Sequence, residues 1–280
     1  MPPIAEHGRV STALPTPAPT STFDAAAIDA AVDELDRDGA TVLRGLLDPL
    51  VVRRWAQAFE LLWERRRTSP HGLAGRGPGR YYTTLPWIGP FADASVYAND
   101  VVLEIVRRVL GPNHVLVQLA ADTPVNGSTH QDMHRDFPPL FGDDVPTPLY
   151  ALAVNFPLCD VREDNGPFRM ARGTHRLRRA EADEAVASGR IPTESVHMDI
   201  GDVMVRTPFQ LHAGSPNVTD RPRPMVVMGY VCDWLRTDNV SLDVPVGYYE
   251  SLDEPTRRLL RANVVDVLED RPETYVHFKH

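Results

Sequence analysis

From His114 onward, the chain alternates short β-branched and apolar runs with segments rich in Pro, Gly, Asn and Asp. The runs cover residues 114–120, 149–156, 202–205 and 225–231. Short strands separated by turn-forming residues are typical of antiparallel sheets that pair as a sandwich or close into a barrel. The pattern therefore predicts a mainly β core made from this part of the chain.

The residues before this core predict helices that flank it. Asp24 is a plausible N-cap for a helix over residues 25–35, and residues 40–44 form an expected strand. Asp48 and Pro49 begin a second expected helix, which runs to about residue 67 with a large apolar face. A third is expected over 100–110, ending at Gly111, and a late one over 254–263. Residues 69–80 are expected to form a loop.

The composition favours one soluble domain after a disordered start. Residues 1–21 are rich in Pro, Thr, Ser and Ala and bury too little apolar surface to fold, so we expect disorder there. Residues 22–280 show no composition break and are expected to form a single domain. The expected location is the cytoplasm, because we find no signal peptide and no apolar run of about 20 residues that could span a bilayer. The sequence leaves open whether the protein is a monomer or a homodimer.

Charge and cysteine content exclude several classes of function. The net charge of −9 disfavours nucleic acid and anionic membranes as partners, since both need a basic surface. The two cysteines, Cys159 and Cys232, are too few for a disulfide framework or a thiolate cluster. Both lie in apolar runs and are expected to be buried free thiols.

One segment contains the pattern His-x-Asp twice, as His130-x-Asp132 and His134-x-Asp136, and a separate His212 follows downstream. In a strand, residues two apart point to the same side, so either pair could aim an imidazole and a carboxylate at one metal ion. Two histidines and one carboxylate can hold Fe(II) and leave positions open for a co-substrate and O2. The spacing alone leaves both pairs possible, although one ion cannot use both because the pairs lie too far apart along a strand.

An arginine follows the distal histidine. Arg223 could bind the far carboxylate of a 2-oxo acid, because a guanidinium offers two parallel hydrogen bonds to a carboxylate. Arg221 is its competitor on the same face of an extended chain. Arg80 could meet an acidic group of a substrate, but we expect it to be a solvated surface residue.

Taken together, these motifs resemble the phytanoyl-CoA dioxygenase family of iron- and 2-oxoglutarate-dependent oxygenases. The resemblance covers most of the chain, from about residue 24 to 231. It is carried by the Gln131-x-x-His134-x-Asp136 segment, the Asp-x-x-x-x-Asn-Gly turn at 160–166, Gly-Thr-His at 173–175, the His212-to-Arg223 interval, and the strand pattern at 38–45.

The resemblance implies a double-stranded β-helix (a jelly-roll, cupin-like core) with the N-terminal helices packed outside it. It also selects the second His-x-Asp pair, because the glutamine of the family stands three residues before the metal histidine, as Gln131 does before His134. The implied iron ligands are therefore His134, Asp136 and His212. Arg223 and Gln131 are the implied contacts to 2-oxoglutarate.

The family also guides the expectations for its neighbouring positions. Some relatives hold 2-oxoglutarate with a threonine two residues after the Asn-Gly turn, and this chain has Phe168 there. His130 becomes a candidate pocket residue or a polar surface residue, and the role of Asp132 stays open. Asn165 and Asn217 are expected to shape turns.

The implied activity is that of a dioxygenase that oxidises, and most simply hydroxylates, a C–H bond and releases succinate and CO2. Halogenation is not expected, because halogenating relatives have a small residue where this chain has Asp136. Aromatic side chains and the acidic net charge favour a small, fairly apolar metabolite, and a role in natural-product biosynthesis. The candidate pocket residues are Phe137, Tyr81, Tyr82, Trp87, His130 and Trp234.

Two other classes of function are compatible with the residues. A cupin-like metal-dependent isomerase or hydrolase would use the three ligands without 2-oxoglutarate, although Arg223 argues against it. A non-catalytic β-barrel that binds a small molecule would use the same residues as polar networks.

Overall fold

The computed structural model describes residues 23–69, 72–142, 147–236 and 242–269. The disorder expected for residues 1–21 therefore falls outside the described residues. The largest element is a seven-stranded antiparallel sheet with the strand order β1-β8-β5-β10-β4-β3-β2. Its strands are β1 (Ala40–Leu43), β2 (Ala74–Gly75), β3 (Arg80–Thr84), β4 (His114–Pro124), β5 (Ala151–Pro157), β8 (Val203–Arg206) and β10 (Met225–Cys232).

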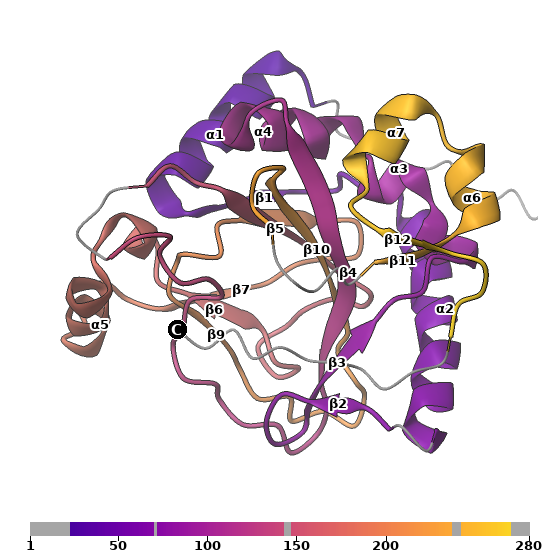
Figure 1. Cartoon of the computed structure of the whole chain (residues 1–280). Coiled ribbons are helices and arrows are strands. Elements are labelled where there is room, and N and C mark those ends of the chain that lie inside the picture. Colours follow the sequence, from indigo (N-terminus) through magenta and orange to yellow (C-terminus); the bar gives the residue numbers. More distant parts are fainter. Residues whose placement is uncertain (1–22, 70–71, 143–146, 237–241, 270–280) are drawn as a thin grey trace, which may run out of the picture.

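A smaller sheet lies beside the large one (Figure 1). It has the antiparallel order β7-β6-β9, with β6 (Phe168–Met170), β7 (Glu194–Val196) and β9 (His212–Gly214). Two antiparallel sheets with these crossed connections form a double-stranded β-helix, which confirms the expected fold class. A separate parallel pair joins β11 (Asp243–Pro245) to β12 (Asn263–Val265).

Helices on the outer side of the large sheet are α1 (Ala25–Asp38), α2 (Pro49–Thr68), α3 (Ala94–Tyr97), α4 (Asp100–Leu110), α6 (Val246–Ser251) and α7 (Glu254–Leu259), with the 3₁₀ turn η1 (Gly89–Ala92). The α5 helix (Arg179–Ala187) and the 3₁₀ turn η2 (Thr174–Arg176) lie on the side of the small sheet, where Ala182 packs with Ala171 and Leu211 (Figure 1). The caps of the first two helices are those that the sequence predicts, because Asp24 accepts a hydrogen bond from the Ala27 amide and Asp48 accepts one from Leu50. The α7 helix ends earlier than expected, and α5 was not predicted.

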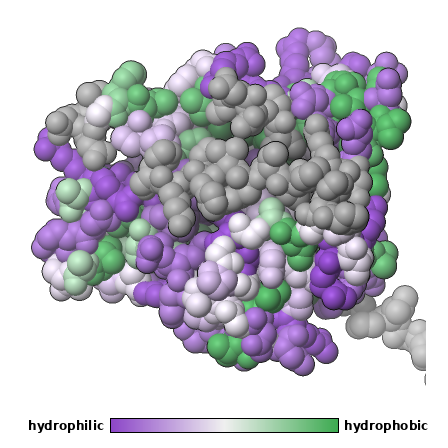
Figure 2. Space-filling model, turned by 60° about the horizontal axis from the view of Figure 1, so that its bottom comes forward, coloured by the Kyte–Doolittle hydropathy of each residue, from purple (hydrophilic) through white to green (hydrophobic). Residues whose placement is uncertain are grey.

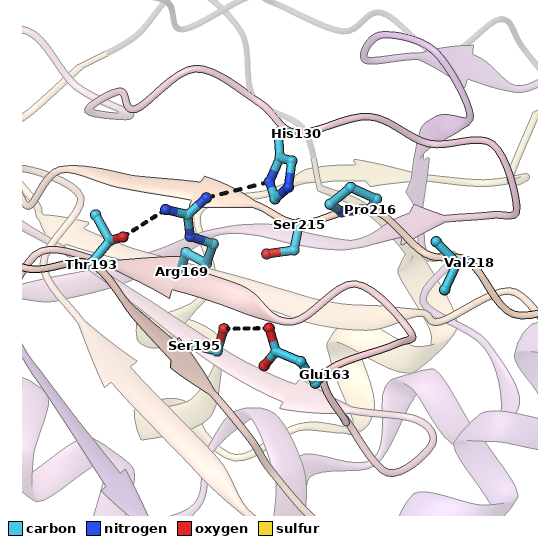
Figure 3. Close-up of a pocket in the computed structure, with 8 residues that line it drawn as sticks. All are labelled: His130, Glu163, Arg169, Thr193, Ser195, Ser215, Pro216 and Val218. Carbon is cyan, nitrogen blue, oxygen red and sulfur yellow. Dashed lines mark hydrogen bonds between the residues drawn. The ribbon is translucent and has the colours of Figure 1, made fainter.

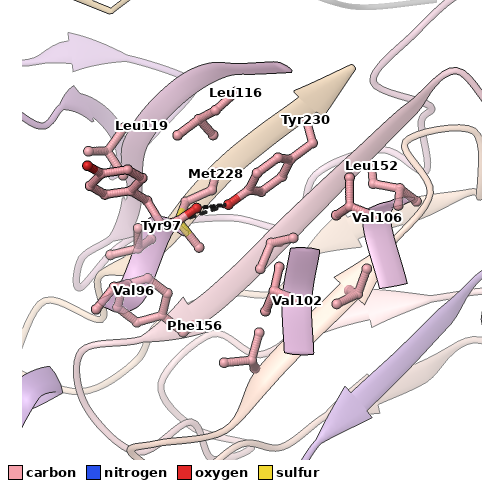
Figure 4. Packing of buried hydrophobic residues seen from close by; sticks show 14 of the residues in the cluster. Val96, Tyr97, Val102, Val106, Leu116, Leu119, Leu152, Phe156, Met228 and Tyr230 are labelled. Carbon is pink, nitrogen blue, oxygen red and sulfur yellow. Dashed lines mark hydrogen bonds between the residues drawn. The ribbon is translucent and has the colours of Figure 1, made fainter. Parts of the chain in front are cut away.

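The main hydrophobic core lies between these helices and the sheet (Figure 4). Trp55 of α2 is fully buried, and its ring meets Phe156 of β5 edge to face at 5.2 Å. Tyr230 of β10 is buried, and its hydroxyl donates to the Tyr97 carbonyl at 2.6 Å. The apolar core thus lies on the helix-covered face of the sheet. Polar side chains, such as the hydrogen-bonded Asn155 and Arg206, lie on the other face.

The described surface is mostly polar. On the face in Figure 2, hydrophilic residues predominate among the described ones, and hydrophobic residues are scattered between them. Single exposed apolar side chains are normal in soluble proteins and do not mark a docking face. Among the described residues, no helix is long and apolar enough to cross a membrane. Cys159 is partly buried and Cys232 is buried, and both are free thiols.

Candidate metal centre

His134, Asp136 and His212 come together at one point between the two sheets. The side-chain atoms that could bind a metal ion all lie within 4.8 Å of one another. His134 and His212 face each other across a pair of backbone hydrogen bonds of 2.9 and 3.0 Å. Within the part of the chain that the structure describes, this is the only group of three or more histidine, cysteine or carboxylate side chains with such spacing.

The segment around His134 is extended but is not a regular strand, which corrects the strand expected there. Only His134 forms a β-bridge, to His212. The neighbouring backbone bonds are unevenly spaced along β9 and the loop before it: they join Gln131 to Gly214, His134 to His212, and Asp136 to Pro208. A bulged segment can aim side chains that a flat strand would turn away. The two ligand positions therefore converge through irregular pairing rather than through strict alternation.

Both histidines are held with the same nitrogen facing the centre. His134 Nδ1 lies 2.8 Å from the Asp132 carbonyl, and His212 Nδ1 lies 2.9 Å from the Gln210 carbonyl. A carbonyl accepts only, so each Nδ1 carries a proton and each Nε2 faces the centre, where it could bind a metal ion. Burial lowers the pKa of His134 to about 4, which keeps this ring neutral near pH 7. Imidazoles oriented in this way are ready metal ligands.

Asp136 is paired with Arg206, a residue that the sequence did not single out. The Arg206 Nη2 atom lies 2.8 Å from Asp136 Oδ2, and both side chains are largely buried. Burial raises the pKa of the Asp136 carboxyl, but the neighbouring His212 and the Arg206 guanidinium outweigh this effect and hold the pKa well below its usual range. The carboxylate is therefore charged and positioned before any metal binds.

Arg206 is itself fixed by side chains from both sheets. Its Nε donates to Asn155 Oδ1 at 3.1 Å, and its guanidinium lies 4.9 Å from the centre of the Phe168 ring. One signal could have revealed it: Arg206 ends an apolar strand run and shares a face with buried Met204. A charged residue at such a position needs a buried partner.

Replacing Arg206 by methionine is expected to lower the free energy of unfolding of the metal-free protein by about 3 kcal/mol, because it leaves the buried Asp136 charge without its partner. A divalent ion would then replace the lost positive charge, so Co(II) should stabilise this variant more than the wild type. Urea unfolding with and without Co(II) measures both effects. Arg67→Met is the control, because the Arg67–Glu64 pair is exposed and contributes little to stability. Equal stability of Arg206→Met and wild type would contradict the expectation.

The first His-x-Asp pair does not join the centre. The side chains of His130 and Asp132 are exposed, and His130 Nδ1 lies 3.4 Å from Arg169 Nη1. Asp132 contributes its backbone carbonyl, which orients His134. The structure thus brings together the second pair with His212, and gives the first pair supporting or surface positions.

Arg223 and Arg221 differ sharply in burial. Arg221 is exposed, whereas Arg223 is only 2% exposed. Burial lowers the pKa of Arg223 to about 10. Its Nη2 donates to the Gly166 carbonyl, and its Nε has no partner among the described residues. A buried guanidinium with spare donors is suited to a carboxylate.

Arg80 is buried, which overturns the expectation of a solvated surface arginine. It is 1% exposed at the start of β3, with Nη1 2.7 Å from Asp122 and Nη2 2.8 Å from the Ser215 carbonyl. Its guanidinium fills the space where a Cβ at position 214 would lie, so Gly214 is needed there. The sequence prediction failed because the glycines before Arg80 indicated a loop, while β2 and β3 pair as a hairpin.

Gln131 and the two turn asparagines hold backbone in place. Gln131 Oε1 accepts a hydrogen bond from the Gly214 amide at 2.9 Å. Asn165 closes its turn by bonds to the Arg162 amide and the Asp160 carbonyl. Asn217 donates to the Pro124 and Arg221 carbonyls, and so shapes the loop that leads to Arg223.

The six candidate pocket residues separate into different regions. Trp87 is fully buried in the main hydrophobic core, where its ring packs against Tyr97. Tyr81 packs on Trp63 of α2, on the helix side of the sheet.

Three other aromatic candidates lie on the inner face or near Asp136. Tyr82 is buried in a small cluster with Ala120, Ala153 and Val227. Phe137 follows Asp136 and packs 6.2 Å from Tyr150, whose ring also lies 6.0 Å from the half-exposed Trp234. Phe137 and Trp234 therefore belong to one aromatic surface, with Tyr150 between them.

The geometry agrees with the outcome of comparison with known protein families. The model of the phytanoyl-CoA dioxygenase (PhyH) family matches residues 35–225, more than half of the chain. The protein belongs to this family. The match includes the convergent centre and ends just beyond Arg223.

Solved structures with the same fold include other members of this structural type. The epimerase SnoN from nogalamycin biosynthesis is 22% identical, with a TM-score of 0.56 over 74% of this chain and 84% of that chain. AviO1 from Streptomyces viridochromogenes Tue57 is 20% identical, with a TM-score of 0.58 over 78% and 99%. HygX from Streptomyces hygroscopicus, solved with nickel and 2-oxoglutarate, is 19% identical, with a TM-score of 0.56 over 74% and 87%.

Phe168 departs from the threonine that some PhyH relatives have at this position. Its ring stacks on the His212 imidazole, with centroids 5.0 Å apart and planes 20° apart. The same ring lies against Arg206. In this family member the position therefore supports the His212 imidazole and the cation that holds Asp136, and it offers no hydroxyl.

Proposed function

We propose that this PhyH-family protein is an Fe(II)- and 2-oxoglutarate-dependent dioxygenase that oxidises, most simply hydroxylates, a C–H bond of a small, fairly apolar metabolite in natural-product biosynthesis. The observation that carries the proposal is the convergence of His134, Asp136 and His212. Two nitrogens and one carboxylate oxygen form a donor set that suits Fe(II) and leaves coordination positions open.

The residues fit the metal in three respects. Each Nε2 faces the centre and could bind a metal ion, because each Nδ1 bonds a carbonyl. The Asp136 carboxyl is ionised through its neighbours. The stacked Phe168 ring restrains the His212 plane, so little side-chain entropy remains to be lost on metal binding.

The residues near Arg223 fit a dicarboxylate. Asp122 is partly buried and lies among three arginines: Arg80 at 2.7 Å, Arg76 at 3.6 Å, and Arg223, whose charge also lowers the Asp122 pKa. Burial raises that pKa, and the three arginines outweigh it. Arg223 itself is buried, and its Nε has no hydrogen-bond partner among the described residues. We assign the far carboxylate of 2-oxoglutarate to Arg223, which would gain a counter-ion and a hydrogen-bond acceptor there.

The bound iron would supply the activation of O2, with 2-oxoglutarate converted to succinate and CO2 as one oxygen atom enters the substrate. The chain holds the reactants in place. Arg223 orients the co-substrate, Arg206 keeps Asp136 in position, and the aromatic surface of Phe137 and Trp234 is the proposed platform for an apolar substrate. Insertion of one oxygen atom into the product separates hydroxylation from the epimerisation named for SnoN.

Binding measurements separate this proposal from the two alternative classes. Calorimetry with Co(II) as an inert stand-in should show one tight metal site, and 2-oxoglutarate should bind to the loaded protein. With Fe(II) and O2, slow succinate formation should accompany this binding. A cupin-like isomerase or hydrolase would bind metal but not 2-oxoglutarate, and a non-catalytic binding protein would bind neither. Either of those outcomes would overturn the proposed function.

A further inference from the structure

A polar pocket lies outside the candidate metal centre, and Figure 3 shows the side chains that line it. It has a volume of about 430 Å³ and is lined by His130, Glu163, Arg169, Thr193, Ser195, Ser215, Pro216 and Val218. Successive strand residues face opposite sides, so Phe168 contacts His212 while Arg169 faces this pocket. The pocket is thus separated from the proposed iron site by the strands β6 and β9.

One end of the pocket presents hydrogen-bond donors. Arg169 Nη2 donates to Thr193 Oγ1 at 2.6 Å, which leaves the threonine hydroxyl hydrogen free to donate. Arg169 Nη1 lies 3.4 Å from His130 Nδ1, so that nitrogen accepts and Nε2 is the donor of the ring. The Ser215 hydroxyl is buried and has no hydrogen-bond partner among the described residues.

The charges in the pocket are unevenly compensated. Glu163 accepts from Ser195 at 3.3 Å and lies 2.9 Å from His197 Nε2. The hydrogen bonds from His197 and then from Ser195 lower the pKa of Glu163. Arg169 is partly buried, and no carboxylate lies within ion-pair distance of it in the described part of the chain. The guanidinium is therefore the cation that a ligand could neutralise.

We infer that this pocket is a second ligand site, which takes a small organic acid bearing a carboxylate or phosphate group. The acidic group would bind Arg169, Ser215, Thr193 and the His130 ring, and the remainder would lie against Pro216 and Val218. This arrangement gives the buried Ser215 hydroxyl a partner and gives Arg169 a counter-ion. The inference is independent of the proposed iron chemistry, because none of these side chains belongs to the candidate metal centre.

Titration of the metal-free full-length protein with phosphate, succinate and benzoate tests the site and distinguishes the two acid groups. Arg169→Gln should weaken binding of the preferred acid about tenfold or more, because a charged hydrogen-bond partner is lost. Ser215→Ala should weaken it about threefold to tenfold. Arg190→Gln is the matched control, since Arg190 is exposed and already paired with Glu184, and its affinity should stay within about twofold of the wild type.

The Arg223→Leu variant distinguishes acid binding at this pocket from acid binding at the co-substrate site, because it removes the buried cation on the other face of the sheet. Its affinity for the preferred acid at the second pocket should equal that of the wild type. Arg169→Lys keeps the charge and should retain more binding than Arg169→Gln, provided that both variants melt like the wild type. The inference is overturned if wild type binds none of the three acids at millimolar concentration, or if Arg169→Gln binds as well as wild type.

Discussion

Replacing His134 by alanine is expected to abolish the tight Co(II) or Fe(II) site, with a loss of affinity greater than about 100-fold. The imidazole Nε2 is one of three donors that converge within 4.8 Å, and the two that remain cannot hold the ion with the same geometry. The backbone bridge to His212 uses the His134 main chain, so the alanine variant should keep its fold. Anaerobic calorimetry with each metal measures the effect.

His134 is a cleaner choice than the other two ligands. Removing Asp136 would also strand the buried Arg206 charge, and removing His212 would leave a cavity beside Phe168. His130→Ala is the matched control, because His130 also precedes an aspartate by two positions but is exposed and bonded to Arg169. Its metal affinity should equal that of wild type. Retention of the metal site in His134→Ala, or its loss in His130→Ala, would refute the ligand assignment.

Replacing Arg223 by glutamine is expected to weaken 2-oxoglutarate binding to the metal-loaded protein by on the order of 100-fold, while metal affinity stays unchanged. The physical reason is that the far carboxylate would enter a buried pocket without the cation placed to pair with it. The KM for 2-oxoglutarate should rise by a similar factor. Titration of Co(II)-loaded protein gives the affinity directly.

Arg221→Gln is the control for this variant. Arg221 stands two residues earlier and is exposed, so its loss should change neither metal nor co-substrate binding. The melting temperature of metal-free Arg223→Gln should stay close to that of wild type or rise, because burying an arginine costs free energy that its hydrogen bond to Gly166 repays only in part. Unchanged 2-oxoglutarate affinity in Arg223→Gln would show that another group anchors the co-substrate.

Two of the helices could be predicted from local sequence patterns. The apolar spacing in residues 49–67 predicted α2, and the five large apolar residues expected on one face are all buried. The α4 helix has the expected bounds, with Gly111 directly after its last residue. These elements could be predicted because their hydrogen bonds are local and their buried face follows the helical repeat.

The short strands could not be predicted from local sequence patterns. The long β4, β5 and β10 were evident as apolar runs, whereas β6, β7 and β9 have three residues each. Three residues contain too little alternation to distinguish a strand from a loop. The pairing of these short strands depends on distant partners, which a local pattern does not contain.

The sequence by itself determined the β core and the flanking helices, because apolar periodicity is a property of the chain alone, and its resemblance to the PhyH family nominated His134, Asp136, His212 and Arg223. Only the tertiary structure decided which side chains those groups meet. The Asp136–Arg206 pair, the burial of Arg80 and the separation of Trp87 from the centre depend on register between strands remote in sequence. In a double-stranded β-helix, this register brings side chains from two sheets into one interior, where low polarity strengthens each charge interaction.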